Sequence, residues 1–282
     1  MQQPAEVEHG FARAAPLVEA QVGRLIAGRH SQPLSLWGRL RRFVVLLLIG
    51  LSHPRRREFL GFVVLDLVRA VALPGYLLGD YAKSWQEDTD FLEELRAVSP
   101  HEDRSAERKF FLRSLAGLVA HLPGDTAEAG TFEGASSWFI CRALQNTGKT
   151  HHAFDSFEGL STPTPEDAEY WRKGELRARE ETVRELLSPF DTQVHKGWIP
   201  KCFEAATIDR LCFAHIDVDL YEPTLQSMEF FYPLVVQGGI IVCDDYGSAL
   251  CPGATQALDE FVAGRPEKLV HAPTGQAFLV KQ

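Results

Sequence analysis

Cysteine is scarce in this chain and absent from the spacings that bind metals or form redox pairs. Only five of the 282 residues are cysteine, the count is odd, and no CxxC pair occurs. Most of the five lie in apolar runs, which is typical of reduced core cysteines in cytoplasmic proteins. We therefore expect a cytoplasmic protein whose thiols are not joined into a disulfide framework.

An excess of positive charge is also missing. The chain has 29 Lys and Arg against 38 Asp and Glu, which gives a net charge of −9. Its isoelectric point is near 5.6. This balance argues against a general nucleic-acid binder. The sequence shows no low-complexity tract or internal repeat, and its length suits one large α/β domain with a small helical segment.

The sequence has no apolar run long enough to predict a membrane-spanning helix. The run at 43–51, FVVLLLIGL, covers about half of a bilayer. A second apolar stretch at 59–78 is interrupted by charged residues and a proline. Arginines lie on both sides of the first run, so 39–57 suits an interfacial helix with weak membrane-surface contact. Helices packed on the main domain or on a partner subunit are the alternative.

The first thirty residues mix acidic, basic and histidine side chains, so we expect no secretory signal. An apolar N-terminal segment without a spanning role also suggests self-association, and we expect a homo-oligomer. The expected location is the cytoplasm, with peripheral membrane contact as the alternative that the basic, apolar segment allows.

The N-terminal third shows no alternation of strands and helices. Residues 1–103 are predicted to form a helical segment that serves as a lid, a dimer contact or a membrane-surface contact. Glycine and proline separate or kink its helices. The expected helices lie at 11–27, 35–51, 56–79 and 85–97.

The remainder, 104–282, has the alternating pattern of an α/β domain. After a helix at 105–122, short apolar runs alternate with helical segments, and a hairpin closes the chain. This order predicts a doubly wound parallel sheet with an antiparallel C-terminal strand. Expected strands are 125–129, 151–155, 192–196, 211–217 and 239–244, expected helices are 136–145, 175–187, 223–235 and 252–262, and the hairpin joins 268–271 to 276–280.

Two acidic clusters follow predicted strands, HIDVDLYEP at 215–223 and GGIIVCDDYG at 238–247. Ligands of an open α/β sheet bind at the carboxyl ends of its strands. Four carboxylates, Asp217, Asp219, Asp244 and Asp245, are therefore expected at one crevice. Unpaired carboxylates repel each other and are costly to desolvate. A hard divalent cation is the expected partner.

A glycine loop, EAGTFEGAS, follows the first predicted strand and opens a helix. This is ExGxxxG, whereas the dinucleotide fingerprint GxGxxG is absent. Its glycines let the backbone pass close to a ligand, with a plain tight turn as the alternative. Asp155 ends the second strand, where acidic residues bind ribose hydroxyls. Phe157 and Trp198 lie near the same edge and suit either an adenine face or plain core packing.

These motifs together resemble one family. AEAGTFEGAS, HHAFDSFEGL, VHKGW, HIDVDLYEPT, GGIIVCDDYG and the closing hairpin look like class I S-adenosylmethionine-dependent methyltransferases of the macrocin and mycinamicin O-methyltransferase type. The resemblance covers the chain from about residue 105 onward. It implies a Rossmann-like methyltransferase sheet, S-adenosylmethionine and Mg²⁺, and methyl transfer to a hydroxyl of a small molecule. The acceptor is often a sugar of a glycosylated natural product.

The resemblance also implies roles for individual residues. The glycine loop would meet the methionine end of the cofactor, Asp155 its ribose, and the following residues its adenosine. Glu133 departs from the basic residue that is usual in the family, and 199–202 depart from its aromatic and Asp-Thr sequence. The implied cofactor residues are Glu128, Gly130, Thr131, Gly134, Ser136, Asp155, Ser156, Phe157 and Trp198, and the implied metal ligands are Asp217, which is also catalytic, Asp244 and Asp245.

The expected chemistry is an in-line displacement at a sulfonium. A sugar hydroxyl is almost wholly protonated at neutral pH, and a bound Mg²⁺ would lower its pKa and fix it in place. One of the metal-site carboxylates, His195 or His215 would take the proton. Both histidines have an alternative as buried, hydrogen-bonded strand residues. Asp219 is instead expected to cap the following helix or to orient Tyr221.

Two other classes of protein remain as alternatives. One is a nucleotide-binding oxidoreductase on a similar sheet, against which the missing GxGxxG and the extra aspartates argue. The other is a non-catalytic, membrane-associated scaffold that uses its arginine-flanked segment to bind lipid. Intact acidic clusters argue against the scaffold, because unused buried carboxylates lower stability.

Overall fold

A computed structural model describes residues 43–45, 47–48, 51, 56–72, 85, 88–99 and 106–282. The chain divides into two compact units, Met1–Ala82 and Lys83–Gln282. The predicted helix at 11–27 and most of the one at 35–51 lie outside the described residues.

Helix is the only regular structure described in the first unit. The helix α3 spans Arg56–Ala72, and the described residues within 43–51 are also helical. The predicted helix at 56–79 is therefore found as far as Ala72, and 73–79 lie outside the described residues. None of the helices in the described parts of the chain is long and apolar enough to cross a membrane.

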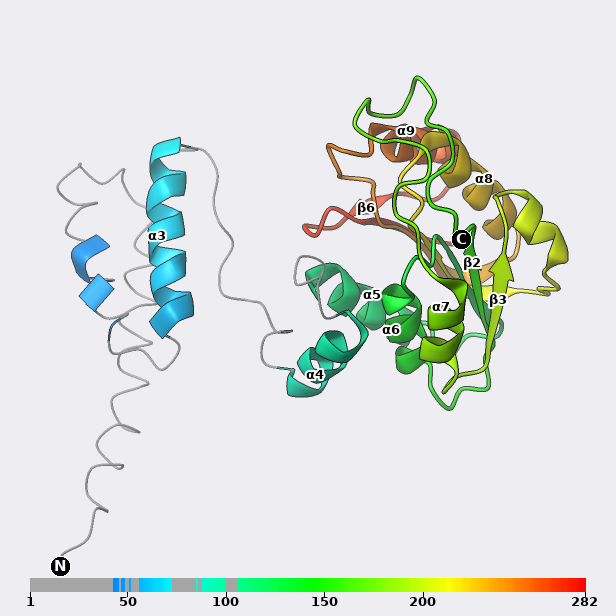
Figure 1. Cartoon of the computed structure of the whole chain (residues 1–282), viewed down its shortest axis with the longest axis horizontal. Coiled ribbons are helices and arrows are strands. Elements are labelled where there is room, and N and C mark those ends of the chain that lie inside the picture. Colours follow the sequence, from blue (N-terminus) through cyan, green and yellow to red (C-terminus); the bar gives the residue numbers. More distant parts are fainter. Residues whose placement is uncertain are drawn as a thin grey trace, which may run out of the picture. The chain divides into compact units, whose positions relative to one another are not determined.

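The second unit alternates strands and helices, as predicted (Figure 1). Its elements are α4 Thr89–Val98, α5 Ala106–Leu118, β1 Asp125–Ala129, α6 Ala135–Ala143, β2 His151–Asp155, α7 Glu180–Leu187, β3 Thr192–Lys196, the 3-10 helix η4 Lys201–Ala205, β4 Leu211–Ile216, α8 Tyr221–Phe231, β5 Val235–Cys243, α9 Pro252–Val262, β6 Val270–His271 and β7 Ala277–Val280.

All seven strands form one sheet in the order β3-β2-β1-β4-β5-β7-β6. Strands β1 to β5 are parallel, whereas β7 is antiparallel to β5 and β6. This arrangement confirms the predicted doubly wound sheet with an antiparallel C-terminal strand. Because β2 lies on one side of β1 and β4 on the other, the winding direction switches there, and the carboxyl ends of β1 and β4 flank a crevice.

Helices cover both faces of this sheet (Figure 1). On one face, α8 and α9 pack over an apolar cluster that includes Ile216 and Met228. On the other, α5 and α6 pack together over a cluster that includes Phe213 and Val242. Burial on both faces explains why the central strand β4 and the second half of β5 are nearly continuous apolar runs.

Several boundaries differ from the predicted ones. Helix α7 begins at Glu180 rather than 175, because the preceding segment turns back: the N–H of Leu160 donates to the carbonyl of Glu175 (2.8 Å), and Leu176 has a φ of 58°. Helix α8 ends at Phe231, and β5 begins at Val235 rather than 239. The earlier start of β5 follows from the pairing of Val235 with Leu211 of β4.

Helix α4 belongs to the second unit. Its buried Phe91 and Leu95 pack against Phe139 of α6, and Asp88 at its N-cap pairs with Arg113 of α5. Along the sequence, the two compact units of the chain meet between Ala82 and Lys83, whereas the predicted domain boundary lies at 103/104. The predicted boundary would separate α4 from the helices on which it packs.

Candidate active site

The glycine loop turns tightly from β1 into α6. The Gly130 N–H donates to the carbonyl of Phe154 on β2 (2.9 Å), and the N–H of Asp217 donates to the carbonyl of Ala129 (2.9 Å). Gly130 has a φ of +87°, and a Cβ at this position would lie 1.7 Å from the carbonyl oxygen of Asp217. Only glycine therefore allows the loop to lie so close to the chain that leaves β4.

Asp155 at the end of β2 holds this loop in place. One of its carboxylate oxygens accepts the N–H of Phe132 (2.8 Å), and the other accepts the N–H of Phe157 (2.6 Å). Burial raises the pKa of Asp155 above its ordinary value, although these backbone donors oppose the rise. The carboxylate thus joins the glycine loop to the segment after β2.

A cavity of about 350 Å³ opens at the carboxyl ends of β1, β2 and β4. It lies at the switch in winding direction, where α/β sheets bind ligands. Loops after β2 and β3 and the start of α8 complete its wall. The residues that the sequence singled out and that line this cavity are Gly130, Asp155, Ser156, Trp198, Asp217 and Asp219.

The other predicted cofactor residues lie outside the cavity wall. Thr131 is buried, and its hydroxyl faces the Phe154 carbonyl. Gly134 is the N-cap of α6, and Ser136 is partly exposed on that helix. Phe157 packs with Val183 and Leu187 of α7 and nearby apolar residues, as its core alternative predicts.

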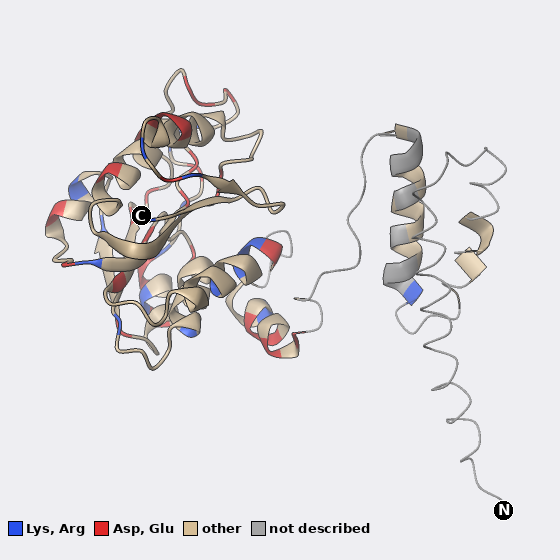
Figure 2. Cartoon of the chain, turned by 180° about the vertical axis from the view of Figure 1, so that it is seen from behind, with Lys and Arg blue, Asp and Glu red and all other residues tan. Residues whose placement is uncertain are grey.

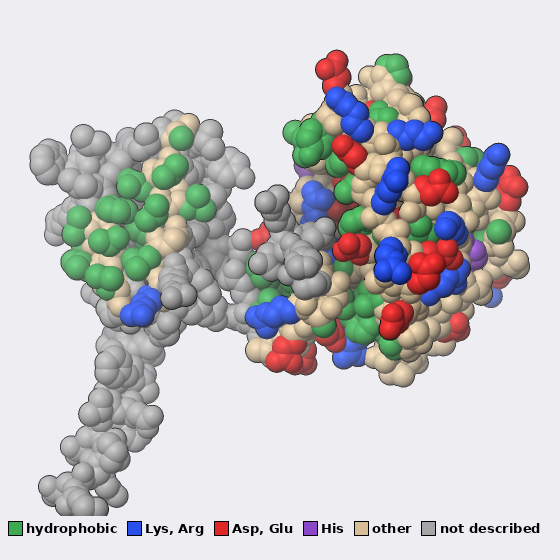
Figure 3. Space-filling view, viewed as in Figure 1, with side chains coloured by type: hydrophobic (Ala, Val, Ile, Leu, Met, Phe, Trp, Pro, Cys, Tyr) green, Lys and Arg blue, Asp and Glu red, His purple; other side chains and the backbone are tan. Residues whose placement is uncertain are grey.

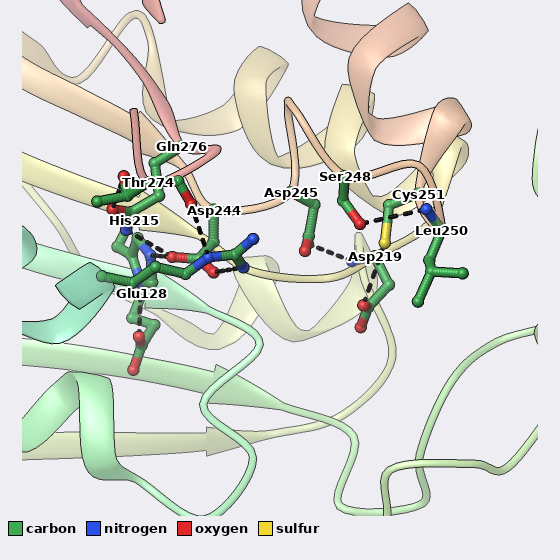
Figure 4. Close-up of polar contacts among 11 residues, drawn as sticks. Glu128, His215, Asp219, Asp244, Asp245, Ser248, Leu250, Cys251, Thr274 and Gln276 are labelled. Atoms are coloured by element: carbon green, nitrogen blue, oxygen red, sulfur yellow. Dashed lines mark hydrogen bonds and ion pairs between the residues drawn. The ribbon is translucent and has the colours of Figure 1, made fainter. Parts of the chain in front are cut away.

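Glu128 is fully buried in a chain of polar contacts (Figure 4). One carboxylate oxygen accepts the Ser137 hydroxyl, and the other lies 2.7 Å from Nδ1 of His215. On the far side, Nε2 of His215 lies 3.4 Å from Oδ1 of Asp244. Glu128 thus meets a histidine inside the sheet instead of lining the cavity.

The two carboxylates that contact His215 favour its protonated form. Burial lowers the pKa of its imidazole, but the hydrogen bonds and charges of Asp244 and Glu128 outweigh burial and raise it to about 10. A buried imidazolium with both nitrogens engaged cannot accept a proton from a substrate. His195 stacks on Phe154, with ring centroids 4.5 Å apart, and does not line the cavity. The alternative of buried, hydrogen-bonded histidine therefore describes His215.

Asp244 has two further partners that the motifs did not predict. Nη1 of Arg108, on α5, donates to Oδ2 of Asp244 (2.6 Å), and Nε2 of Gln276, before β7, donates to Oδ1 (2.6 Å). Although burial opposes ionisation, His215 and Arg108 hold the pKa of Asp244 below its usual value. Arg108 and Gln276 are distant in sequence and belong to no motif.

The four aspartates divide into two groups, and Figure 4 shows three of them, with Asp244 beside His215 and with Asp219 and Asp245 near Cys251. Asp217 and Asp244 gather with His215, whereas Asp219 and Asp245 gather with Cys251. The structure therefore brings together two of the predicted metal ligands, Asp217 and Asp244, and places the third, Asp245, in the neighbouring group. Burial and the neighbouring carboxylates raise the pKa of both Asp217 and Asp245 well above the usual range. Such crowding is what a bound divalent cation would relieve.

Asp219 neither caps α8 nor orients Tyr221, so both expectations for it are wrong. The N–H of Tyr221 instead donates to Oδ1 of Asp167 (2.7 Å), and the Tyr221 hydroxyl donates to Glu260 (2.7 Å). Asp219 has a φ of 61°, unusual for a residue other than glycine, and its carboxylate lines the cavity. Burial and the charge of Asp217 raise the pKa of Asp219 to about 7.

Solved structures share this fold. The O-methyltransferase NovP matches with a TM-score of 0.53 and 25% identity, over 63% of this chain and 80% of NovP. CalS11, a calicheamicin methyltransferase, matches with a TM-score of 0.54 and 17% identity, over 74% of this chain and 96% of CalS11. The sheet therefore has the Rossmann-like fold of class I methyltransferases.

Curated sequences are similar over about half of the chain. Demethyldecarbamoylnovobiocin O-methyltransferase of Streptomyces niveus is 32% identical over 51% of this chain and 60% of that enzyme. Mycinamicin III 3''-O-methyltransferase of Micromonospora griseorubida is 29% identical over 50% of this chain and 61% of that enzyme. The chain thus matches less than two thirds of the length of these relatives.

The family model for macrocin-O-methyltransferase (TylF) matches residues 113–275, which is more than half of the chain. The chain therefore belongs to the macrocin O-methyltransferase family. The match includes the glycine loop, Asp155 and both acidic clusters, and it begins after Arg108.

Substituting Gly130 by Ala tests the contact between the glycine loop and the chain after β4. We expect Gly130→Ala to lower the free energy of unfolding by about 2–5 kcal/mol, through left-handed strain and overpacking together. Gly148→Ala is the control, because Gly148 has a φ of +72° but no atom within 4 Å of the added methyl. It should cost only about 1–2 kcal/mol. Equal losses in urea unfolding would show that the close approach is unimportant.

Replacing His215 tests its role as a buried cation. His215→Gln leaves Glu128 and Asp244 without their shared positive partner, so we expect a loss of about 3–5 kcal/mol in unfolding free energy at neutral pH. His195→Gln removes a partly exposed, stacked ring, and should cost about 1 kcal/mol. Urea unfolding of both variants gives the comparison. A His215→Gln protein as stable as the His195→Gln protein would contradict the assignment.

Proposed function

We propose that this protein transfers a methyl group from S-adenosylmethionine to a hydroxyl of a small molecule. The observation that carries the proposal is one cavity that joins the glycine loop and Asp155 to Asp217 and Asp219. Cofactor-binding and acid–base residues must meet at one place for an in-line displacement. Membership of the macrocin O-methyltransferase family supports the same reaction.

The cofactor would lie along the ends of β1 and β2. Asp155 is the proposed ribose ligand, with Gly130, Ser156 and Trp198 as neighbours in the cavity wall. The wall also contains several apolar residues that suit an adenosine. The other predicted cofactor residues would act indirectly, by shaping the glycine loop and the packing around the cavity. These residues are Glu128, Thr131, Gly134, Ser136 and Phe157.

Mg²⁺ fits the chemistry of the acidic residues. Carboxylate oxygens are the ligands that hard divalent cations prefer, and Asp217, Asp244 and Asp245 are the proposed set. The Asp217 carboxylate accepts no hydrogen bond from the described residues, and Asp244 retains acceptor capacity beside Arg108 and Gln276. When bound, such an ion lowers the pKa of an acceptor hydroxyl.

The proton of the acceptor hydroxyl would pass to a carboxylate. Asp217 and Asp219 are the two aspartates of the acidic clusters that line the cavity, whereas His215 is enclosed between Glu128 and Asp244. A base must come within hydrogen-bond reach of the proton that it removes. We therefore assign this step to Asp217 or Asp219 rather than to a histidine.

The acceptor is proposed to be a sugar hydroxyl of a glycosylated natural product. Two relatives are named for positions on such compounds, mycinamicin III 3''-O-methyltransferase and 8-demethyl-8-(2,3-dimethoxy-alpha-L-rhamnosyl)-tetracenomycin-C 4'-O-methyltransferase of Streptomyces olivaceus. The loop after β2 contributes Gly159, Leu160, Ser161 and Leu176 to the cavity wall. Variation in such loops changes specificity on a constant scaffold.

The predicted assembly into a homo-oligomer remains a prediction.

Calorimetry separates this proposal from its alternatives. We expect the protein to bind S-adenosylmethionine and S-adenosylhomocysteine and not a nicotinamide cofactor. Tight nicotinamide binding without S-adenosylmethionine binding would instead favour the oxidoreductase. Binding of neither would favour a non-catalytic scaffold.

Replacing Asp155 tests the cofactor site. We expect Asp155→Ala to raise the Kd for S-adenosylhomocysteine by about 10-fold or more, because charge-assisted hydrogen bonds to the ribose are lost. Asp209→Ala is the control, since Asp209 is exposed and its one ion pair among the described residues is with its neighbour Arg210. Titration calorimetry gives both values, and thermal unfolding checks that the fold is retained. An unchanged Kd in a folded Asp155→Ala protein would refute this assignment.

Replacing Asp217 tests the metal site. Asp217→Asn should abolish metal-dependent turnover of an accepted glycoside and weaken Mn²⁺ binding, while S-adenosylhomocysteine binding stays within about threefold. Asp244→Asn should also abolish turnover. Mn²⁺ titration followed by electron paramagnetic resonance measures the metal directly. Full activity of either variant, or undiminished wild-type activity in excess EDTA, would exclude the metal role.

A further inference from the structure

The first unit exposes an apolar arc on α3. Val64, Leu65, Leu67 and Val68 have between 40% and 55% of their surface exposed. At about 100° per residue, these positions fall on one side of the helix. Figure 3 shows hydrophobic side chains gathered over this helix. A surface of this kind on a folded protein marks a binding face rather than a solvent face.

The residues before α3 also include exposed apolar side chains. Val44 is 45% exposed and Leu51 is 59% exposed, and both are helical residues within the apolar sequence run FVVLLLIGL at 43–51. Among the described residues of this unit, no helix is long and apolar enough to cross a bilayer. Short apolar helices of this kind suit the boundary between headgroups and acyl chains.

The charge of the first unit indicates which partner covers this face. Residues 39–57 contain six arginines and no acidic residue, and α3 begins with Arg56. Figure 2 shows basic colouring at one end of this helix. Residues 1–82 contain ten basic and six acidic residues, whereas the rest of the chain contains 19 and 32. The two units therefore carry opposite net charge, and such asymmetry indicates a polyanionic partner.

A second copy of the same face is a poorer partner. Pairing two arginine-rich segments would bring like charges together around the apolar contact, which disfavours association. An anionic lipid surface instead offers phosphates to the arginines and an apolar layer to the exposed side chains.

We propose that residues 39–72 bind the surface of an anionic membrane. The arginines of 39–57 would pair with lipid phosphates, and the apolar arc of α3 would enter the interface without spanning it. Both contributions are needed, because either one alone gives only marginal attachment. The proposal is independent of the methyl-transfer reaction and of the metal site.

The experiment is vesicle flotation with the full-length protein. Vesicles of equal parts phosphatidylcholine and phosphatidylglycerol should carry most of the protein upward, and pure phosphatidylcholine vesicles should carry at least tenfold less. High salt should weaken binding to the anionic vesicles, because the arginine contribution is screened. Absence of binding to the anionic vesicles at low salt would overturn the proposal.

A matched pair of triple variants locates the surface. Val64, Leu65 and Val68 changed to Gln should lower the bound fraction at least tenfold. Leu118, Leu250 and Val280, which are 65%, 50% and 44% exposed in the second unit, changed to Gln should leave it unchanged. Circular dichroism checks that both proteins are folded.

Three outcomes would contradict this placement. The two triple variants could bind vesicles equally, or binding could be the same for both lipid compositions. Light scattering without lipid could also show that the α3 variant alone dissociates an oligomer while its vesicle binding is unchanged. The last result would assign the apolar arc to a contact between copies instead of a membrane.

Discussion

The charge on His215 is the interaction on which the site depends. His215 belongs to β4, its Nδ1 lies 2.7 Å from Glu128 of β1, and its Nε2 faces Asp244, which directly follows β5. One imidazolium therefore ties together the carboxyl ends of three neighbouring strands. Without a cation in this place, burial would drive these acids toward their neutral forms. With it, the pKa of Asp244 is low and its carboxylate is fixed between β4 and α5.

The division of the aspartates follows from strand geometry. Side chains alternate along an extended chain, so Asp217, two residues after His215, stays on the side of His215. The φ of 61° at Asp219 breaks this alternation, and the Asp219 carboxylate gathers with Asp245 and Cys251 instead. Asp244 and Asp245 are adjacent and therefore diverge, one toward His215 and one toward the backbone N–H of Asp219, which it accepts at 3.1 Å. Four carboxylates from two loops thus form two neighbouring groups. The cavity reaches these groups through Asp217 and Asp219.

Local pattern predicted the sheet well and the site in part. Strands β1, β2 and β3 have the predicted bounds, because each is a short run that ends at a glycine or acidic turn. The start of β5 was missed because its pairing with β4, not its own composition, decides it. Arg108 and Gln276 were missed for the same reason: their contacts with Asp244 span 136 and 32 residues. Contacts between residues so far apart in the sequence cannot be recognised from the spacing of residues within a motif.

The balance of charge among the buried acidic and basic residues gives a physical reason to expect cationic ligands at this site. Glu128 and the four aspartates lie together, and the cations in hydrogen-bond contact with them among the described residues are His215 and Arg108. Full ionisation would leave a surplus of negative charge, which burial penalises strongly. Raised pKa values at Asp217 and Asp245 are one response, and binding of positive ligands is the other. A divalent ion and a sulfonium would both reduce this surplus, whereas an anionic cofactor placed beside Asp217 would increase it. The carboxylates whose pKa values are raised by crowding are thus the groups that a cationic ligand would stabilise in their ionised form.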